Sequence, residues 1–219
     1  MIKHVFFDFN GTLLDDVKLC MDLLNMMLKS QNKETVDVEK YKNIFTFPII
    51  NYYVNAGLDF NIESFESLAH KFMDNYLKMY VDCKLYNGVY ETLQFLKDKG
   101  VKIYILSASK QDILNMQCDY FGLTKYFDDI LGTKDIYAKT KEDVAISFMA
   151  KHEMNDEEAI FIGDTLHDAD VAKLMNVRCY LVSCGHQSKE VLSKSNAIIV
   201  DDINKLRVDY NEIFNRWKF

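Results

Sequence analysis

The sequence is poor in the residues that mark several common ligand-binding loops. It has eight glycines in 219 residues, and no two of them lie closer than ten residues apart. This spacing excludes the glycine-rich loops that bind dinucleotides or nucleotide phosphates, and also the Gly-x-Ser-x-Gly turn of many serine hydrolases. The His-Glu-x-x-His pair of zinc proteases is absent as well. Any catalytic function must therefore depend on a different pattern of residues.

The sequence also lacks a basic tract and a long apolar run. Lysine and arginine total 26 against 33 aspartate and glutamate residues, a formal charge of −7 that argues against nucleic-acid binding. The longest stretch without charge, between Lys42 and Asp59, includes Pro48 and Asn51 and is too short and too polar to span a bilayer. The hydrophobic share of 49% is ordinary for a globular chain. We therefore expect a folded protein without nucleic-acid or membrane partners.

No Cys-x-x-Cys pair and no recognisable secretory leader occur in the sequence, which begins almost directly with an apolar, strand-like run. An odd number of scattered cysteines is typical of reduced thiols inside the cell. We therefore predict a cytoplasmic protein and leave its oligomeric state open. The cysteines are Cys20, Cys83, Cys118, Cys179 and Cys184.

Apolar runs alternate with helical patterns from residue 88 onward. Runs such as 102–106, 159–162 and 179–182 are rich in β-branched and aromatic residues, and stretches with helical spacing follow them. Strands that alternate with helices of about ten residues indicate βαβ units and a parallel sheet with helices on both faces. We therefore predict an α/β fold with a Rossmann-like parallel sheet, and a closing helix over residues 203–216.

Residues 16–85 interrupt this pattern directly after the first expected strand. The stretch shows no convincing strand, and its apolar residues recur at helical spacing. We therefore predict an α/β core formed by residues 1–15 and 86–219, and an inserted all-helical cap formed by residues 16–85. Hinges are expected at Asp15-Asp16 and Asn87-Gly88, and segment 45–49 is the expected specificity loop of the cap.

Polar side chains stand where the predicted strands end. Asp8 follows the first strand, Ser107 the second and Asp164 a later one, and Asp168 lies four residues beyond Asp164. Because the carboxyl ends of parallel strands meet at one edge of a sheet, we expect these side chains to converge. Three acids at one place are costly unless a cation neutralises them, and oxygen ligands suit Mg²⁺. A serine hydroxyl and a lysine beside the metal would bind a phosphoryl group, which an aspartate can accept covalently.

The order of these residues resembles the haloacid dehalogenase superfamily, whose members are mostly Mg²⁺-dependent phosphohydrolases. The resemblance covers essentially the whole chain. The helical insertion after the first strand and the segment 86–93 are similar to the phosphoglycolate phosphatase-like subgroup. The resemblance implies a Rossmann-like core with a helical cap, and hydrolysis of a small phosphorylated metabolite through an aspartyl-phosphate.

The resemblance also implies a role for each matching position. Asp8 would be the nucleophile and a metal ligand, and the backbone carbonyl of Asn10 would be a second metal ligand. Thr12 would help to position the nucleophile. Ser107 and the backbone amide of Ala108 would bind the phosphoryl group.

Two further acids and a lysine complete the implied site. Asp164 would be a metal ligand, and Asp168 would either reach the metal through water or hold the lysine. Lys139 and Lys141 compete for the lysine position. Residues 140–143 are similar to the Ser/Thr-Lys-x-Glu form of the motif, which favours Lys141. Its amine would offset negative charge on the nucleophile and the phosphate.

Asn10 departs from the family pattern, in which an aspartate protonates the leaving group and then activates water. A carboxamide can do neither at neutral pH, and loss of a general acid–base costs about 10²–10⁴ in rate. Three explanations stay open: a slow or specialised phosphatase, a phospholigand-binding protein without turnover, and an ordinary phosphatase carrying a trapping substitution. His167 is a conceivable substitute proton carrier. On sequence alone, Asn10→Asp is expected to raise turnover at least about tenfold.

Two other reactions of this superfamily fit the sequence poorly. Dehalogenation usually has tyrosine at position 10 and an arginine in the cap, whereas the arginines are Arg178, Arg207 and Arg216. Phosphonate cleavage would need a small residue at position 10 and a Schiff-base lysine from the cap. The sequence places none of the cap lysines in an evident apolar niche.

Overall fold

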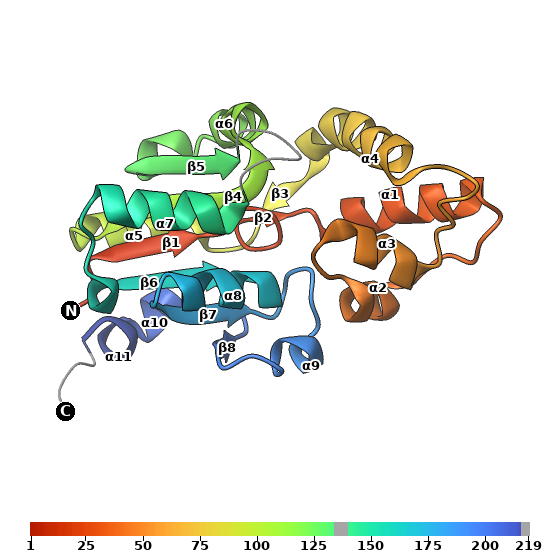
Figure 1. The fold of residues 1–219 in the computed structure, drawn as a ribbon. Coiled ribbons are helices and arrows are strands. Elements are labelled where there is room, and N and C mark those ends of the chain that lie inside the picture. The colour runs from red at the N-terminus through yellow and green to blue at the C-terminus, as the bar shows by residue number, and fades with distance from the viewer. Residues whose placement is uncertain (134–139, 216–219) are drawn as a thin grey trace.

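A six-stranded parallel sheet and the helices packed on it form the larger part of the molecule in a computed structural model, which describes residues 1–133 and 140–215. The strand order is β5-β4-β1-β6-β7-β8 (Figure 1). The α/β fold class with a Rossmann-like sheet, predicted from the alternation of strands and helices, is confirmed. The strands are β1 (His4–Phe7), β4 (Lys102–Lys110), β5 (Asp129–Thr133), β6 (Ala159–Gly163), β7 (Arg178–Val182) and β8 (Ile198–Val200).

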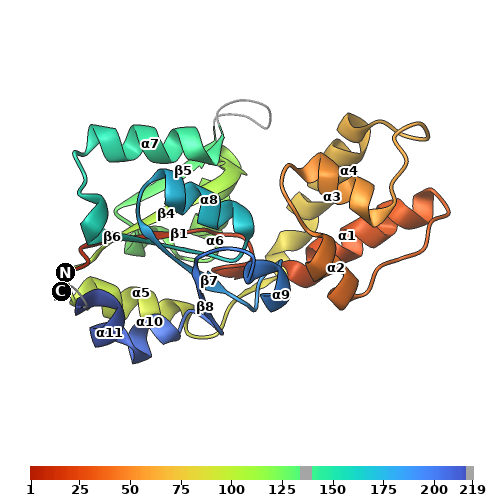
Figure 2. The ribbon, with the colours of Figure 1, turned by 60° about the horizontal axis from the view of Figure 1, so that its bottom comes forward.

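Helices cover both faces of this sheet, with α7 and α8 on one side and α5, α10 and α11 on the other (Figure 2). The single closing helix predicted over 203–216 is wrong, because Asp209 leaves the helical conformation (φ −99°, ψ 25°) and separates α10 from α11. The helices are α5 (Val89–Asp98), α6 (Gln111–Tyr120), α7 (Lys141–Lys151), α8 (Leu166–Leu174), α9 (Lys189–Leu192), α10 (Lys205–Val208) and α11 (Tyr210–Asn215), and the 3-10 turns are η2 (Thr124–Tyr126) and η3 (Asp156–Glu158).

Strand β1 lies at the centre of the sheet, between β4 and β6. Val5 and Phe7 enter the hydrophobic cluster on one face, and Phe6 enters the cluster on the other, because successive strand residues point to opposite faces. All three side chains are fully buried. The chain therefore leaves β1 at a fixed point on the carboxyl edge of the sheet, and the next residue is Asp8.

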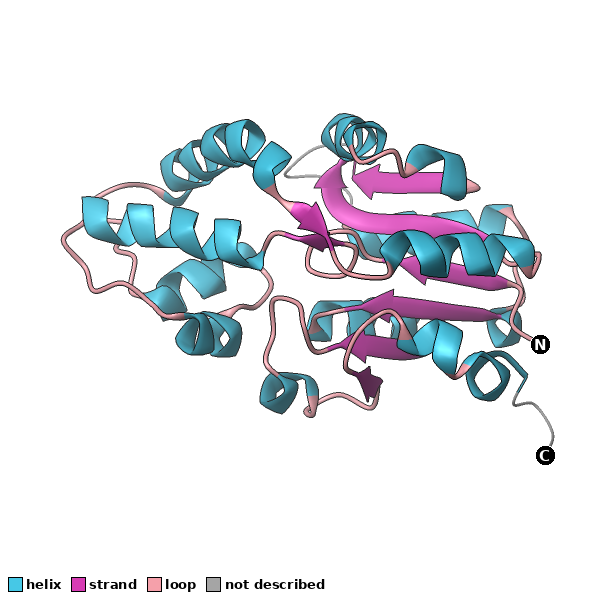
Figure 3. Ribbon diagram, turned by 180° about the vertical axis from the view of Figure 1, so that it is seen from behind, coloured by secondary structure: helices cyan, strands magenta, loops and turns pink. Residues whose placement is uncertain are grey.

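A second group of helices lies beyond the carboxyl edge of the sheet (Figure 3). It consists of α1 (Val17–Ser30), α2 (Val38–Ile44), α3 (Ile49–Ala56), α4 (Phe65–Met79) and the turn η1 (Tyr80–Asp82). These helices, called the cap below, enclose a hydrophobic cluster of their own.

Two short strands join the cap to the sheet. β2 (Leu14–Asp15) and β3 (Lys84–Leu85) pair antiparallel, so the chain leaves and re-enters the core at neighbouring positions. The boundaries predicted for core and cap, and the hinges beside them, stay a proposal. No described helix combines the length and the apolar character that a membrane span requires.

Candidate active site

Three carboxylates and one lysine meet at the carboxyl edge of the sheet. Asp8 follows β1, Asp164 follows β6, and Asp168 lies in the first turn of α8. All three are buried, and each offers an oxygen within 4.8 Å of the others. Lys141 begins α7, and its Nζ forms ion pairs with Asp8 Oδ1 and, at 2.6 Å, with Asp168 Oδ1. Lys139, the other lysine considered for this position, lies outside the described residues.

A capping box explains why Lys141 begins its helix at this point. The Thr140 hydroxyl accepts a hydrogen bond from the backbone N–H of Asp143, whose carboxylate accepts one from the backbone N–H of Thr140. Two N–H groups at the helix start are satisfied in this way. The residues that resemble the Ser/Thr-Lys-x-Glu motif therefore start the helix and direct Lys141 into the site.

Asp168 uses both of its oxygens within the protein. Oδ1 accepts from Lys141, and Oδ2 accepts from the backbone N–H of Asp164 at 3.1 Å and from the N–H and hydroxyl of Thr165 at 2.9 and 2.7 Å. Burial would raise the pKa of Asp168, but the charge and hydrogen bond of Lys141 outweigh burial and lower it. Asp168 therefore anchors Lys141 and the loop between β6 and α8.

The other two carboxylates are less well compensated. Burial raises the pKa of Asp8 to about 8, although Lys141 opposes the shift. Burial also raises the pKa of Asp164 to about 6, although His186 opposes that shift. Carboxylates outnumber the ammonium group here, and such an excess of buried charge is costly unless a cation compensates it. The oxygen donors therefore fit a hard divalent cation.

Asp164 is held by the turn that follows β1. The hydroxyl of Thr12 donates to Asp164 Oδ1 at 3.1 Å, and the backbone N–H of His186 donates to Oδ2 at 2.6 Å. Gly11 has a φ of +73°, and a Cβ added there would lie 2.2 Å from Asp164 Oδ2. Only glycine combines this conformation with so close an approach. Thr12 thus contacts the carboxylate of Asp164, and its predicted role in positioning the nucleophile stays a proposal.

Ser107 lies within β4, not directly after it as the sequence suggested. The pairing of β4 with β5 shifts register between Leu106 and Lys110, so the strand is irregular where it reaches the site. The buried Ser107 Oγ accepts from the backbone N–H of Ser109 at 3.1 Å. Ala108 between them is exposed. The roles of Ser107 and Ala108 in phosphate binding stay a proposal.

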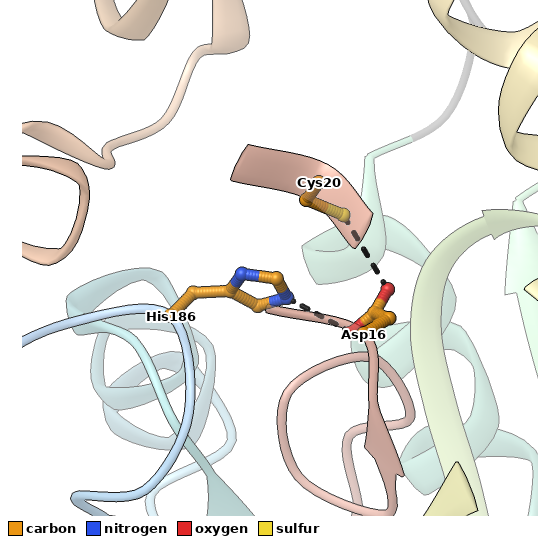
Figure 4. Close-up of side chains that lie close together, drawn as sticks. All are labelled: Asp16, Cys20 and His186. Carbon is orange, nitrogen blue, oxygen red and sulfur yellow. Dashed lines mark hydrogen bonds and ion pairs between the residues drawn. The ribbon is translucent and has the colours of Figure 1, made fainter. Parts of the chain in front are cut away.

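A second buried polar group lies where the cap meets the core (Figure 4). Asp16, just before α1, has Oδ1 3.2 Å from Nε2 of His186, which lies in the loop after β7. The Cys20 thiol donates to Asp16 Oδ2 at 3.6 Å, and the Tyr41 hydroxyl is 2.8 Å from His186 Nδ1. The sequence predicts Asp16 only as a hinge residue and indicates no role for His186.

The charges of this second group balance each other. Burial would raise the pKa of Asp16, but the charge and hydrogen bond of His186 outweigh burial and lower it. Burial would lower the pKa of His186, but Asp16 raises it to about 8. Burial raises the pKa of the Cys20 thiol, which keeps its proton. An ionised pair with filled hydrogen bonds results.

The side chain of Asn10 is hydrogen-bonded to the second group. Its Nδ2 donates to Asp16 Oδ2 at 2.8 Å and to the Tyr76 hydroxyl at 2.7 Å. Its Oδ1 accepts from the Ser109 hydroxyl at 3.0 Å. Both amide hydrogens therefore have partners, and the carbonyl oxygen faces the irregular part of β4.

The predicted specificity loop of the cap packs against the core. The rings of Phe45 and His186 stack with centroids 4.7 Å apart, and those of Phe47 and His167 with centroids 4.6 Å apart. Gln187 Nε2 donates to the carbonyl of Phe45 at 2.8 Å. His167, considered above as a proton carrier, is half-buried in α8 and covered by Phe47. Aromatic side chains thus line the cap beside both buried groups.

A family comparison agrees with this architecture. Residues 5–182 match the family model described as haloacid dehalogenase-like hydrolase. The chain therefore belongs to this family, and the resemblance inferred from the sequence is confirmed. The prediction that the chain is an enzyme of the family is confirmed with it.

Individual relatives extend the similarity over nearly the whole chain. The phosphoglycolate phosphatase of Pseudomonas syringae pv. tomato is 24% identical over 218 residues, covering 93% of this chain and 78% of the relative. Phosphoglycolate phosphatase 1 of Pseudomonas aeruginosa is 25% identical over 213 residues with the same coverage. The structure of a predicted phosphatase from Clostridium acetobutylicum superposes with a TM-score of 0.80 at 25% identity, covering 97% of this chain and 99% of that one.

Proposed function

We propose that this protein is a Mg²⁺-dependent phosphohydrolase that acts on a small phosphorylated metabolite. The observation that carries the proposal is the buried group of Asp8, Asp164 and Asp168, in which Lys141 pairs with Asp8 and Asp168. A bound cation would neutralise the excess negative charge of this group, and its one lysine can bind a negatively charged phosphoryl group. The names of the relatives support phosphate ester chemistry.

Asp8 is the nucleophile of the proposed reaction. Its carboxylate oxygen forms a bond to phosphorus while the bond from phosphorus to the leaving oxygen breaks, and the leaving oxygen takes up a proton from solvent water. A second water then attacks the aspartyl-phosphate and loses a proton to solvent, which releases inorganic phosphate and regenerates the Asp8 carboxylate. Lys141 stabilises the negative charge of the transferring group, and Ser107 with the amide of Ala108 holds its oxygens.

Mg²⁺ would be held by Asp8, Asp164 and the backbone carbonyl of Asn10. When bound, it neutralises charge on the phosphoryl oxygens and orients them. Both oxygens of Asp168 already accept hydrogen bonds, Oδ1 from Lys141 and Oδ2 from the β6–α8 loop. Of the two roles left open for Asp168, its contacts support holding the lysine.

The cap favours a small substrate. Its loop 45–49 is hydrogen-bonded to the core through Phe45, and Phe47 covers His167. An aromatic cover excludes bulk water during transfer and leaves little room for a protein substrate. The relatives include phosphoglycolate phosphatases and a protein named putative pyrophosphatase. Phosphoglycolate and pyrophosphate are therefore the first compounds to test.

A second candidate function is phospholigand binding without turnover. The observation in its favour is Asn10, whose amide stands at the position of the family's acid–base residue and has both hydrogens bonded elsewhere. Phosphate and metal binding would survive this change, since the backbone carbonyl is unaffected.

One assay separates the two functions. Purified protein is incubated with Mg²⁺ and an activated aryl phosphate, phosphoglycolate or pyrophosphate, with Asp8→Asn as the control. Turnover above the control, abolished by EDTA, supports the phosphohydrolase. No turnover combined with a rise in melting temperature on adding Mg²⁺ and phosphate supports binding alone. The absence of both responses would contradict both functions.

A further inference from the structure

We propose that Asp16 is a positioning residue of this enzyme, and that Asn10 and Asp16 form a matched pair. In this pair the buried carboxylate at position 16 fixes the amide at position 10, so that its carbonyl oxygen faces the irregular part of β4 beside the nucleophile. The inference deepens the proposed function and rests on it.

The hydrogen bonds of Asn10 allow one orientation of its amide. The two N–H groups point to Asp16 Oδ2 and to the Tyr76 hydroxyl, and the carbonyl oxygen accepts from the Ser109 hydroxyl. A rotation of the amide by half a turn would place its oxygen against the Asp16 carboxylate, where two acceptors would face each other. The orientation of Asn10 therefore depends on Asp16.

Asp16 is itself held from three parts of the chain. The backbone N–H of Gly11 donates to Asp16 Oδ1 at 3.1 Å from the nucleophile loop, and Tyr76 donates to Oδ2 at 2.8 Å from the cap. His186 pairs with Oδ1 from the loop that also contacts Asp164. A buried carboxylate with so many partners is fixed in position. It connects the cap to the loop that carries Asp8.

The pairing changes the expectation for Asn10→Asp. An aspartate at position 10 would bring a second carboxylate to the place where Nδ2 now lies, 2.8 Å from Asp16 Oδ2. It would repel Asp16 and would have no hydrogen to donate to it. The single variant should therefore not show the tenfold gain that the sequence alone suggests, because the gain requires a neutral donor at position 16.

A double-mutant cycle tests the pair. The variants are Asp16→Asn, Asn10→Asp and the swap Asn10→Asp/Asp16→Asn, and the control is Asp15→Asn, whose side chain is exposed. We expect each single variant to lower kcat at least about threefold with little change in KM. The kcat of the swap, relative to the wild type, should be at least about tenfold higher than the product of the relative kcat values of the two single variants. The reason is that the carboxylate at position 10 then accepts a hydrogen bond from the amide introduced at position 16. The control should match the wild type.

The results that would overturn the inference are distinct from a failure of the proposed function. A gain of about tenfold or more in Asn10→Asp alone, an unchanged kcat in Asp16→Asn, or additive effects in the swap would each contradict the pairing. A wild type with no turnover above Asp8→Asn contradicts the proposed function and the positioning role. The pairing is then judged by melting temperature: it predicts a loss of at least about 3 °C in each single variant and recovery in the swap.

Tyr76→Phe covers the case in which Asp16→Asn fails to fold. The change removes the hydroxyl that accepts from Asn10 and donates to Asp16, and it leaves every charge in place. We expect kcat to fall at least about threefold at constant KM, because the hydrogen bonds to Asn10 and Asp16 are both lost. An unchanged kcat in a folded Tyr76→Phe protein would contradict the role of Asp16.

Discussion

Two buried polar groups lie next to each other in this molecule and differ in how their charge is balanced. Asp8, Asp164 and Asp168 lie close together, and the one lysine beside them pairs with Asp8 and Asp168. Burial raises the pKa of Asp8 to about 8 and that of Asp164 to about 6. In the second group, the pKa of Asp16 is lowered because His186 outweighs the effect of burial. The first group has more negative than positive charge, whereas the charge of Asp16 in the second group is balanced by His186.

The difference in charge balance distinguishes the two groups as candidate cation sites. Within each group, the candidate ligand atoms lie within 4.8 Å of one another. The spacing of the ligand atoms therefore does not show which of the two groups is the better metal site. A bound cation would relieve repulsion in the first group. In the second group it would displace the hydrogen bonds among Asp16, His186 and Cys20 and would have to remove a proton from the thiol. We therefore propose that the metal binds to the first group and that the second group positions Asn10.

The largest expected effect is that of Asp8→Asn. The variant should lose at least about a thousandfold in kcat, because an amide cannot serve as the nucleophile. It should keep or raise the melting temperature of the metal-free protein, because it removes one of the repelling carboxylates. Thermal unfolding in EDTA and a steady-state assay provide the two measurements. A marked drop in melting temperature would contradict the inference that the carboxylates of the first group repel one another.

Lys141→Met should cause the largest loss of stability. It leaves Asp8 and Asp168 buried without their counter-ion, and breaking such a pair costs roughly 3–5 kcal/mol. Denaturant unfolding of the metal-free protein measures this cost. Lys18→Met, in which the exposed ion pair with Asp22 is removed instead, serves as the control and should change little. Equal losses in the two variants would contradict the account.

Mg²⁺ should stabilise the folded protein through the first group only. At about one hundred times the dissociation constant, the gain is about 2.7 kcal/mol. Asp164→Asn should abolish the rise in melting temperature, whereas Asp16→Asn should retain it. The opposite pattern would move the cation to the second group.

The smallest expected effect is a dependence of stability on pH that comes from His186. The pKa of this residue rises from 6.5 to about 8 on folding. A raised pKa contributes stability that is complete below pH 6.5 and is lost as the pH rises through about 8, in total about 2 kcal/mol. The loss between pH 6 and pH 9, measured in EDTA, should therefore be about 2 kcal/mol larger in the wild type than in His186→Gln. Parallel profiles of the two proteins would contradict the ionised pair.

The first group could be predicted from the sequence because each member has a local signal. Asp8 and Asp164 follow apolar strands, Asp168 stands in a first helical turn, and Lys141 begins a capped helix. Parallel strands then bring the carboxyl ends together without any further information. The irregular pairing around Ser107 has no such signal, since a register shift depends on the neighbouring strand.

The second group could not be predicted because its contacts join distant segments. Asp16 and His186 are 170 residues apart in the sequence and meet only when the cap lies against the core. Asp16 directly precedes α1, where an acid commonly caps the helix, yet its side chain makes no capping hydrogen bond. Without the position of the cap, the local sequence therefore gives neither the burial of Asp16 nor its partner.

The most direct test of the central claim is a crystal structure of the protein with Mn²⁺ and phosphate, read by anomalous scattering. The account predicts one strong peak about 2.2 Å from oxygens of Asp8 and Asp164, with phosphate facing Asp8. It also predicts Asp16 and His186 still hydrogen-bonded to each other. An anomalous peak between Asp16, Cys20 and His186 would contradict this assignment. A well-measured anomalous map with no peak beside Asp8 would contradict it as well.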